Sequence, residues 1–195
     1  MTVQHPHLSG TVEAPARLSV TPYISPDYAR AEKDKLWRKV WQVACREEEI
    51  PNPGDYYTYD ILDQSVIVLR TDDGSVRAHF NACRHRGRRL TKGCGRAQHF
   101  TCPYHGWQWD GEGEDIFVLN REDWNGSLTD EMLRLRSVRT ALWGGFVFVT
   151  FDPDAAPLEE FLQEVPYWLG PLEMEKMRYK WRQWMKLGCN WKDVV

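Results

Sequence analysis

Between residues 40 and 151, short apolar stretches alternate with turns rich in glycine, proline and aspartate. Short apolar runs bounded by such turns are the pattern of β-strands. Gly145–Phe151 is almost wholly apolar, as expected of a strand that is buried on both faces. Many short strands with regular turns predict an all-β sandwich or barrel. We expect strands at residues 41–45, 55–62, 65–70, 75–80, 98–101, 107–109 and 145–151.

The flanking regions follow other patterns. Residues 1–21 show little periodicity and predict an irregular, mobile tail. Ser25 and Pro26 are suited to the N-cap and first position of a helix, and apolar residues at helical spacing extend this helix to Lys39. After Phe151 we expect a linker over residues 152–157, a helix over residues 157–168, and a strand over residues 176–182, where basic and apolar residues alternate.

Two short cysteine–histidine limbs are the strongest chemical signal in the chain. The first is Cys83-Arg84-His85 and the second is Cys102-Pro103-Tyr104-His105. Gly87 and Gly106 follow the two limbs and permit sharp turns, so each limb is predicted to be a tight loop. A two-iron cluster with unlike irons needs two cysteines on one iron and two histidines on the other. Two loops that each offer one thiolate and one imidazole meet that need.

A zinc site and a chance grouping of residues are the alternatives to the cluster. A Cys2His2 zinc module has the same donors, but zinc sites usually pair like ligands along the sequence, whereas each limb here is mixed. The limbs could also be unrelated buried cysteines and scattered histidines. The grouping of the donors into two tight pairs beside glycines disfavours this second alternative.

These limbs resemble a known family. Cys83-Arg84-His85-Arg86-Gly87 and Cys102-Pro103-Tyr104-His105-Gly106-Trp107 are similar to the cluster-binding loops of Rieske [2Fe–2S] proteins, and in particular to the α (terminal oxygenase) subunits of aromatic-ring-hydroxylating oxygenases. Respiratory Rieske proteins carry an additional disulfide between their loops. Here the corresponding positions are Arg88 and Tyr104, which favours the oxygenase or soluble ferredoxin branch.

The resemblance implies a fold, a site and a function. The fold is an all-β, Rieske-type β-sandwich with an N-terminal helix and a two-loop cluster-binding subdomain, followed by the start of an α+β catalytic domain. The [2Fe–2S] cluster is held by Cys83 and Cys102 on one iron and by His85 and His105 on the other, and it carries one electron at a time. Tyr104 and Trp107 are expected to pack over the cluster or to be ordinary core aromatics. In the family, these electrons reach a mononuclear iron that activates dioxygen to hydroxylate an aromatic or related apolar substrate.

The C-terminal residues carry a second part of the resemblance. Asn190-Trp191-Lys192 is similar to the motif that opens the catalytic domain of oxygenase α subunits. Oxygen-activating mononuclear iron is typically bound by two histidines and one carboxylate. His5, His7, His79 and His99 show no such arrangement, so this chain is expected to be catalytically incomplete and to have no catalytic residues of its own. We therefore divide it into an N-terminal tail and helix (residues 1–39), a Rieske domain (residues 40–151), and a linker, helix and first strand of a truncated catalytic domain (residues 152–195).

Charge is unevenly distributed along the chain. The net charge is −3, yet the stretch from Cys83 to His105 has six basic residues and no acidic residue. Such a run is either a solvated loop face or a docking surface for an acidic electron donor. Nucleic acid is not expected, because the chain as a whole is acidic. The basic residues are Arg84, Arg86, Arg88, Arg89, Lys92 and Arg96.

Composition and resemblance complete the expectations. A ferredoxin or reductase is the implied electron donor, and a trimer-type homo-oligomer, possibly with a β subunit, is the implied assembly. No apolar run of eighteen residues or signal-peptide pattern is present, so neither a membrane span nor export is expected. Cys45, Cys94 and Cys189 are expected to be reduced thiols of a cytoplasmic protein. The alternative functions are a stand-alone Rieske ferredoxin, which leaves residues 152–195 without a purpose, and the zinc module.

Overall fold

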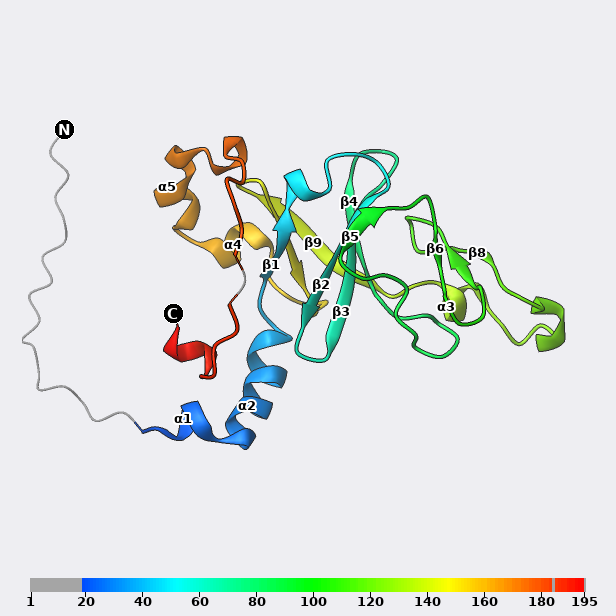
Figure 1. Cartoon of the computed structure of the whole chain (residues 1–195), viewed down its shortest axis with the longest axis horizontal. Helices are drawn as coiled ribbons and strands as arrows, with labels where there is room; N and C mark the ends of the chain where they lie inside the picture. Colours follow the sequence, from blue (N-terminus) through cyan, green and yellow to red (C-terminus); the bar gives the residue numbers. More distant parts are fainter. Residues whose placement is uncertain (1–18, 184, 195) are drawn as a thin grey trace, which may run out of the picture.

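The computed structural model describes residues 19–183 and 185–194. A large antiparallel sheet lies in the middle of the molecule, a small sheet with its loops and the short helix α3 (Asp130–Leu133) lies at one end, and the other α-helices lie toward the opposite end (Figure 1). The large sheet has the strand order β1-β10-β9-β4-β3-β2-β5, and the small sheet has the order β6-β7-β8. The protein is therefore mostly β, as the sequence predicted. The strands are β1 (Gln42–Arg46), β2 (Asp55–Ile61), β3 (Gln64–Arg70), β4 (Val76–Phe80), β5 (Cys94–Arg96), β6 (Phe100–Thr101), β7 (Gln108–Trp109), β8 (Asp115–Phe117), β9 (Ser137–Trp143) and β10 (Phe146–Thr150).

The strands predicted between residues 41 and 151 agree with the structure, and three further strands were missed. Strands β5 and β8 are only three residues long and have no sustained alternation, so local pattern could not reveal them. Strand β9 is longer, but its burial pattern is irregular. All three are fixed by their neighbours: β5 pairs with β2, β8 with β7, and β9 with both β4 and β10.

Helices precede and follow the large sheet along the sequence, as expected, although their limits differ. The Ser25 hydroxyl accepts a hydrogen bond from the Tyr28 amide at 3.3 Å, which confirms the predicted N-cap. The α-helix ends at Glu32, and the chain continues to Trp37 as a π-helical turn. The predicted helix at residues 157–168 is broken at Gln163, which has a positive φ of 50°. The helices and turns are α1 (Thr21–Ile24), α2 (Pro26–Glu32), η1 (Lys33–Trp37), η2 (Glu47–Glu49), η3 (Arg121–Trp124), α3 (Asp130–Leu133), α4 (Leu158–Leu162), α5 (Val165–Leu169), η4 (Gly170–Leu172), η5 (Met174–Lys176) and η6 (Trp191–Asp193).

Strand β3 is buried on both faces and joins the two parts of the molecule. Val66 and Val68 point into the main core of the large sheet. Ile67 and Leu69, on the opposite face, pack with Phe100 of the small sheet. Since successive side chains of a strand point to opposite faces, one apolar strand holds both cores together.

Strand β10 has the same two-sided burial, as its continuous apolar sequence predicted. Val147 and Val149 are buried in the main core. On the other face, Phe148 packs with Trp41 and with Leu158 and Leu162 of α4. The helix that follows the sheet is thus fixed against the outside of β10. No helix among the described residues is long and apolar enough to cross a membrane.

The predicted strand at residues 176–182 is wrong. This segment forms a 3₁₀ turn and irregular chain, and its large apolar side chains are mostly exposed. A strand needs a partner for its backbone groups, and none of the described strands pairs with this segment. The expected tail at residues 1–21 falls mostly outside the described residues, and its last part contains the start of the short helix α1.

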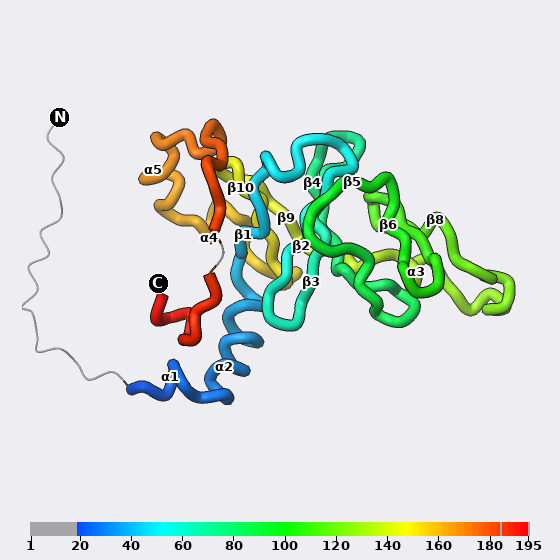
Figure 2. Tube along the Cα trace, in the orientation of Figure 1, coloured from blue at the N-terminus to red at the C-terminus, as the bar shows by residue number. Residues whose placement is uncertain are grey.

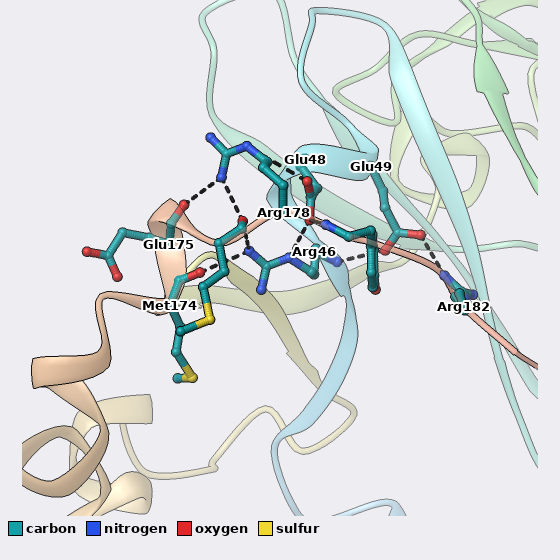
Figure 3. A network of polar contacts seen from close by, with 9 residues as sticks. Arg46, Glu48, Glu49, Met174, Glu175, Arg178 and Arg182 are labelled. Atoms are coloured by element: carbon teal, nitrogen blue, oxygen red, sulfur yellow. Dashed lines mark hydrogen bonds and ion pairs between the residues drawn. The ribbon is translucent and has the colours of Figure 1, made fainter.

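The segment is instead fixed to the sheet through Arg46 at the end of β1 (Figure 3). The buried guanidinium donates to the carbonyl oxygens of Met174 and Met177 at 3.0 and 2.8 Å, and to the Glu48 carboxylate at 2.7 Å. Further along, Arg182 donates to Glu49 at 2.7 Å. Gly145 permits this close approach, since a Cβ there would lie 2.8 Å from the Cα of Glu175.

The chain then returns toward the N-terminal helix (Figure 2). The Lys192 ammonium donates to Glu32 at 2.7 Å, and the indole of Trp191 lies edge-on against Trp37, with centroids 5.1 Å apart. Asn190, whose side chain caps η6, also donates to the carbonyl of Tyr23 at 3.0 Å. The ends of the described chain are thereby joined.

Removing the Arg46 guanidinium should release residues 174–182. The Arg46→Met variant removes the closer of the two cations beside Glu48 and the donor to two carbonyl oxygens, and breaking a buried ion pair costs about 3 kcal/mol or more. Chymotrypsin cleavage after Tyr179 and Trp181 should then accelerate by at least about tenfold, because about 1.4 kcal/mol changes an equilibrium by a factor of ten. Arg178→Met is the matched control, since the exposed Arg178 guanidinium hydrogen-bonds mainly to its own segment and lies 3.8 Å from Glu48. Equal cleavage of Arg46→Met and wild type would show that the guanidinium does not hold the segment.

Candidate metal centre

The two predicted loops have the same backbone scaffold. In the first, the Cys83 amide donates to Arg88 O at 2.8 Å and the Gly87 amide donates to Cys83 O at 2.8 Å. In the second, the Cys102 amide donates to Trp107 O at 2.8 Å and the Gly106 amide to Cys102 O at 3.0 Å. Each cysteine is therefore followed, four residues later, by a glycine that closes the turn.

The glycines have a conformational role at these positions. Gly87 and Gly106 have φ values of 68° and 72°, in the left-handed region that other residues rarely adopt. No heavy atom lies within 4 Å of a Cβ added to either glycine, so backbone conformation and not crowding requires them. The predicted sharp turns are therefore present.

The loops bring like donors together. The Nδ1 atoms of His85 and His105 lie 3.1 Å apart, and their rings have centroids 4.7 Å apart. The Cys83 and Cys102 thiols are both buried in the same cluster, and the neighbouring Cys102 contributes to the raised pKa of Cys83. Each mixed limb of the sequence thus contributes to one sulfur pair and one imidazole pair in space.

The surroundings of Cys83 and His85 favour a protonated thiol and a neutral imidazole. Burial raises the pKa of the Cys83 thiol, and burial together with the charge of His105 lowers the pKa of His85. Metal binding requires deprotonated thiols and neutral imidazoles. Binding a cation would therefore release a proton from Cys83, whereas His85 is already favoured in the required neutral state.

Aromatic side chains enclose the histidine pair. The indole of Trp107 is buried and stacks on His85, with centroids 4.8 Å apart and planes 14° apart. Tyr104 stacks on His105 with centroids 3.8 Å apart, yet remains exposed. Trp107 is thus part of the subdomain core, whereas Tyr104 covers its neighbour from the solvent side.

Asn81 is a site residue that the sequence analysis missed. Its buried side-chain oxygen accepts hydrogen bonds from the Leu90 and Thr91 amides at 2.8 and 3.0 Å. Its Nδ2 donates to Thr91 O at 2.9 Å and to Ser65 Oγ at 3.0 Å. It therefore ties the end of the first loop to β3. The sequence signal for this role was the position of Asn81, a polar residue that directly follows a predicted strand and precedes Cys83.

His79 joins β4 to the small sheet and is not a metal-site histidine. Its Nε2 contacts Gly111 O at 3.0 Å, and its Nδ1 is a buried atom without a hydrogen-bond partner in the described part of the chain. The ring packs so closely on the β7–β8 turn that a Cβ at Gly113 would lie 2.7 Å from its Cε1. His79 is accordingly a packed strand residue, and His99 is exposed.

Among the described residues, no three His, Cys, Asp or Glu side chains form a group that could hold a single metal ion. The donors meet as two pairs, each of one kind. The remaining cysteines are apart from these pairs: Cys45 is buried in the main core, and Cys94 and Cys189 are exposed free thiols. Burial raises the pKa of Cys45 to about 12, which makes it an unreactive core residue.

The curled antiparallel sheet and its paired sulfur and imidazole loops define a Rieske-type domain, and residues 40–120 match the family described as Rieske [2Fe-2S] domain. The chain carries the Rieske domain of the large (α) oxygenase subunits, as its motifs predicted. This family implies a [2Fe–2S] cluster, and two thiols beside two imidazoles are the donor set that such a cluster requires.

Several relatives support this assignment. The chain is 38% identical over 144 residues to the large oxygenase component of the naphthalene 1,2-dioxygenase system of Pseudomonas putida, covering 72% of this chain and 32% of that protein. It is 35% identical over 155 residues to the anthranilate 1,2-dioxygenase large subunit of Acinetobacter baylyi, covering 78% and 33%. It is 30% identical over 182 residues to the carnitine monooxygenase oxygenase subunit of Escherichia coli, covering 89% and 47%. The chain thus spans between about a third and a half of the length of these relatives.

Solved structures show the same similarity. A quaternary ammonium Rieske monooxygenase in complex with L-carnitine superposes with a TM-score of 0.83 at 26% identity, covering 90% of this chain and 50% of that one. A naphthalene 1,2-dioxygenase variant bound to phenanthrene gives a TM-score of 0.71 at 36% identity, covering 76% and 34%.

Removing the Asn81 amide should loosen the first loop. Asn81→Ala leaves two loop amides and one carbonyl without their partner, and each unsatisfied buried group costs about 1–3 kcal/mol. We expect the free energy of unfolding in urea to fall by about 3 kcal/mol and bound iron to be lost on desalting. Gln98→Ala, an exposed change in the small-sheet region, should stay within about 0.5 kcal/mol of wild type. Wild-type stability and iron content in Asn81→Ala would exclude this role.

The burial of His79 should make folding sensitive to acid. Burial lowers its pKa in the native protein below the ordinary value of 6.5, so the unfolded chain binds more protons as the pH falls. The stability that neutral His79 contributes is present above pH 6.5 and is lost as the pH falls through the native pKa. His79→Gln keeps a donor for Gly111 O but does not titrate.

In urea titrations, the unfolding free energy of wild type, measured relative to that of His79→Gln, should therefore fall between pH 7 and pH 5. Histidines common to both proteins cancel in this comparison. A difference that stays constant between pH 7 and pH 5 would contradict the linkage.

Proposed function

We propose that Cys83 and Cys102 bind one iron of a [2Fe–2S] cluster as thiolates and that His85 and His105 bind the other iron through Nδ1. The observation that carries this proposal is that like donors face each other, sulfur with sulfur and imidazole with imidazole. Two nitrogens bound to one metal at about 2.0–2.1 Å lie roughly 3.0–3.5 Å apart. The observed Nδ1–Nδ1 distance of 3.1 Å is in that range. The cluster supplies one-electron transfer when it is bound, and its potential is tuned by solvent exposure and hydrogen bonding.

A Cys2His2 zinc module remains the alternative with the same donors. Zinc in a structural site is surrounded tetrahedrally by its four ligands. Pairs of like donors at opposite ends of a site suit two irons bridged by sulfide better than one ion. The similarity to Rieske oxygenases supports the same choice.

The larger protein function is also a proposal. We propose that this chain is the electron-transfer part of an oxygenase α subunit and delivers electrons to a mononuclear non-heme iron, which is bound by residues outside this chain. Hydroxylation of an aromatic or related apolar compound is supported by the naphthalene and anthranilate relatives. Mono-oxygenation of a quaternary ammonium compound is the second candidate, because the carnitine enzymes match a larger share of the chain than these two relatives do.

The domain limits follow from this proposal. Residues 40–151 form the Rieske domain, residues 1–39 precede it, and residues 152–195 lead into the catalytic domain. The bonds of Arg46 and Lys192 support this division, because they hold the leading segment against the Rieske sheet and the N-terminal helix. A stand-alone ferredoxin would not require a segment after the Rieske domain, so these contacts disfavour that alternative.

The electron donor is proposed to be an acidic ferredoxin or reductase. Of the basic residues between the loops, Arg89 is paired with Asp60 at 2.9 Å and Arg84 donates to Met132 O at 2.9 Å. Arg86, Arg88 and Lys92 are exposed and have no ion-pair partner within the described ranges. These three residues form the candidate docking surface. A cytoplasmic homo-oligomer of trimer type, in some family members joined by a β subunit, is proposed on family resemblance.

Metal analysis tests the central proposal. Purified protein should contain about two irons and two acid-labile sulfides per chain. Cys83→Ser and Cys102→Ser should lose most of both, because each removes a thiolate ligand. Cys94→Ser is the matched control, since this exposed cysteine lies between the loops but belongs to neither donor pair. About one zinc per chain without sulfide would replace the proposal by the zinc alternative.

A further inference from the structure

Trp124 lies in the loop that extends beyond the small sheet, between β8 and α3. Figure 1 shows this yellow-green loop at the end of the molecule opposite the C-terminal segment. The indole is 36% exposed and belongs to the 3₁₀ turn η3, which is bounded by Asn120 and Asn125, both with positive φ. The position is distant in sequence from both cysteine–histidine loops, and neither motif points to it.

The indole nevertheless contacts the centre of the candidate site. Its ring lies edge-on to the imidazole of His85, with centroids 5.9 Å apart and planes 87° apart. It also lies edge-on to Trp107, with centroids 6.0 Å apart and planes 74° apart. Trp107 itself stacks on His85. The three rings form one cluster in which each contacts the other two, in the edge-to-face and stacked arrangements that aromatic pairs prefer.

The turn that carries Trp124 is fixed by several bonds. Its carbonyl oxygen accepts hydrogen bonds from the Ser127 hydroxyl at 2.7 Å and the Ser127 amide at 2.9 Å. At the other end of the turn, Arg121 donates to Asp115 at 2.9 Å and to Asp130 at 3.1 Å. These contacts tie η3 to the ends of β8 and α3, so the indole is held in place against His85.

His85 is thereby confined on three sides. Trp107 covers one face of the imidazole, Trp124 lies against it edge-on, and the Nδ1 atom faces His105. Tilting the His85 ring out of its present plane would break its stacking on Trp107 and its edge-on contact with Trp124. The aromatic contacts therefore favour the ring plane in which Nδ1 faces His105.

We propose that Trp124 is a positioning residue for His85: it holds the imidazole in the orientation needed to bind iron and shields that ligand from water. This inference rests on the proposed ligand role of His85. Interactions beyond the ligands orient them, and the apolar shell around a site controls water access and therefore potential. Greater exposure favours the more negatively charged, reduced state of a cluster, so removal of the indole should raise the midpoint potential.

The test uses the full chain with Trp124→Ala, Trp124→Leu and Trp124→Phe. The alanine and leucine variants lack the ring, and the leucine variant retains apolar bulk if alanine impairs folding. Phenylalanine keeps an aromatic edge and should restore wild-type behaviour. Trp168→Ala is the control, because Trp168 is 65% exposed and contacts only Tyr167 among aromatic rings of the described residues.

Three properties are measured: the midpoint potential by redox titration, the g-values of the dithionite-reduced protein by electron paramagnetic resonance, and the rate of iron loss to a chelator. We expect Trp124→Ala and Trp124→Leu to show changed g-values and several-fold faster iron loss, and Trp124→Ala to show a raised potential. Trp124→Phe and Trp168→Ala should match wild type.

The outcomes distinguish a failure of the positioning role of Trp124 from a failure of the proposed [2Fe–2S] cluster. A cluster of wild-type potential, g-values and iron-loss rate in both Trp124→Ala and Trp124→Leu would overturn the positioning role while leaving the [2Fe–2S] proposal intact. Wild-type protein that lacks iron and sulfide would instead overturn the proposed function, and with it the role of Trp124. Urea unfolding of the same variants serves as a further check: a loss of stability with unchanged g-values and potential would assign Trp124 to loop packing alone.

Discussion

The meeting of two short loops is the constraint on which the rest of the structure depends. Each loop is closed by the same two backbone hydrogen bonds and by a glycine with positive φ, so both present their donors from equivalent turns. The histidine follows its cysteine by two residues in the first loop and by three in the second. Opposed in space, these mixed limbs place thiol beside thiol and Nδ1 beside Nδ1. A cluster with one sulfur-bound and one nitrogen-bound iron needs this arrangement, because each iron takes one donor of the same kind from each loop.

The large sheet provides the support that keeps the loops opposed. Strand β3 contributes Val66 and Val68 to the main core and Ile67 and Leu69 to the contact with the small sheet. His79 and Asn81, at the C-terminal end of β4, add polar contacts: Asn81 to the end of the first loop and His79 to the β7–β8 turn. The apolar contacts hold the subdomain on the sheet, and the polar contacts determine its orientation, because hydrogen bonds are directional and apolar burial is not.

The C-terminal segment is attached to the Rieske domain by charged groups. Arg46 binds carbonyl oxygens of this segment, and Lys192 pairs with Glu32 of the N-terminal helix. Both contacts use charged groups that are largely removed from solvent, so the cost of leaving one unpaired is high. The C-terminal segment therefore contacts both the large sheet, through Arg46, and the N-terminal helix, through Lys192.

The sequence by itself determined the local features: the donor types, the turns at Gly87 and Gly106, the N-cap at Ser25, and the strands whose apolar pattern is long enough to recognise. These depend on residues that are close along the chain. Tertiary structure decided which donors face each other, placed Asn81 and Trp124 beside the first loop, and left residues 176–182 without the strand that their alternation favoured. Hydrogen-bonding partners and ring contacts come from distant parts of the chain, and a strand exists only where another strand satisfies its backbone groups. Alternation of apolar and polar residues carries no information about that partner.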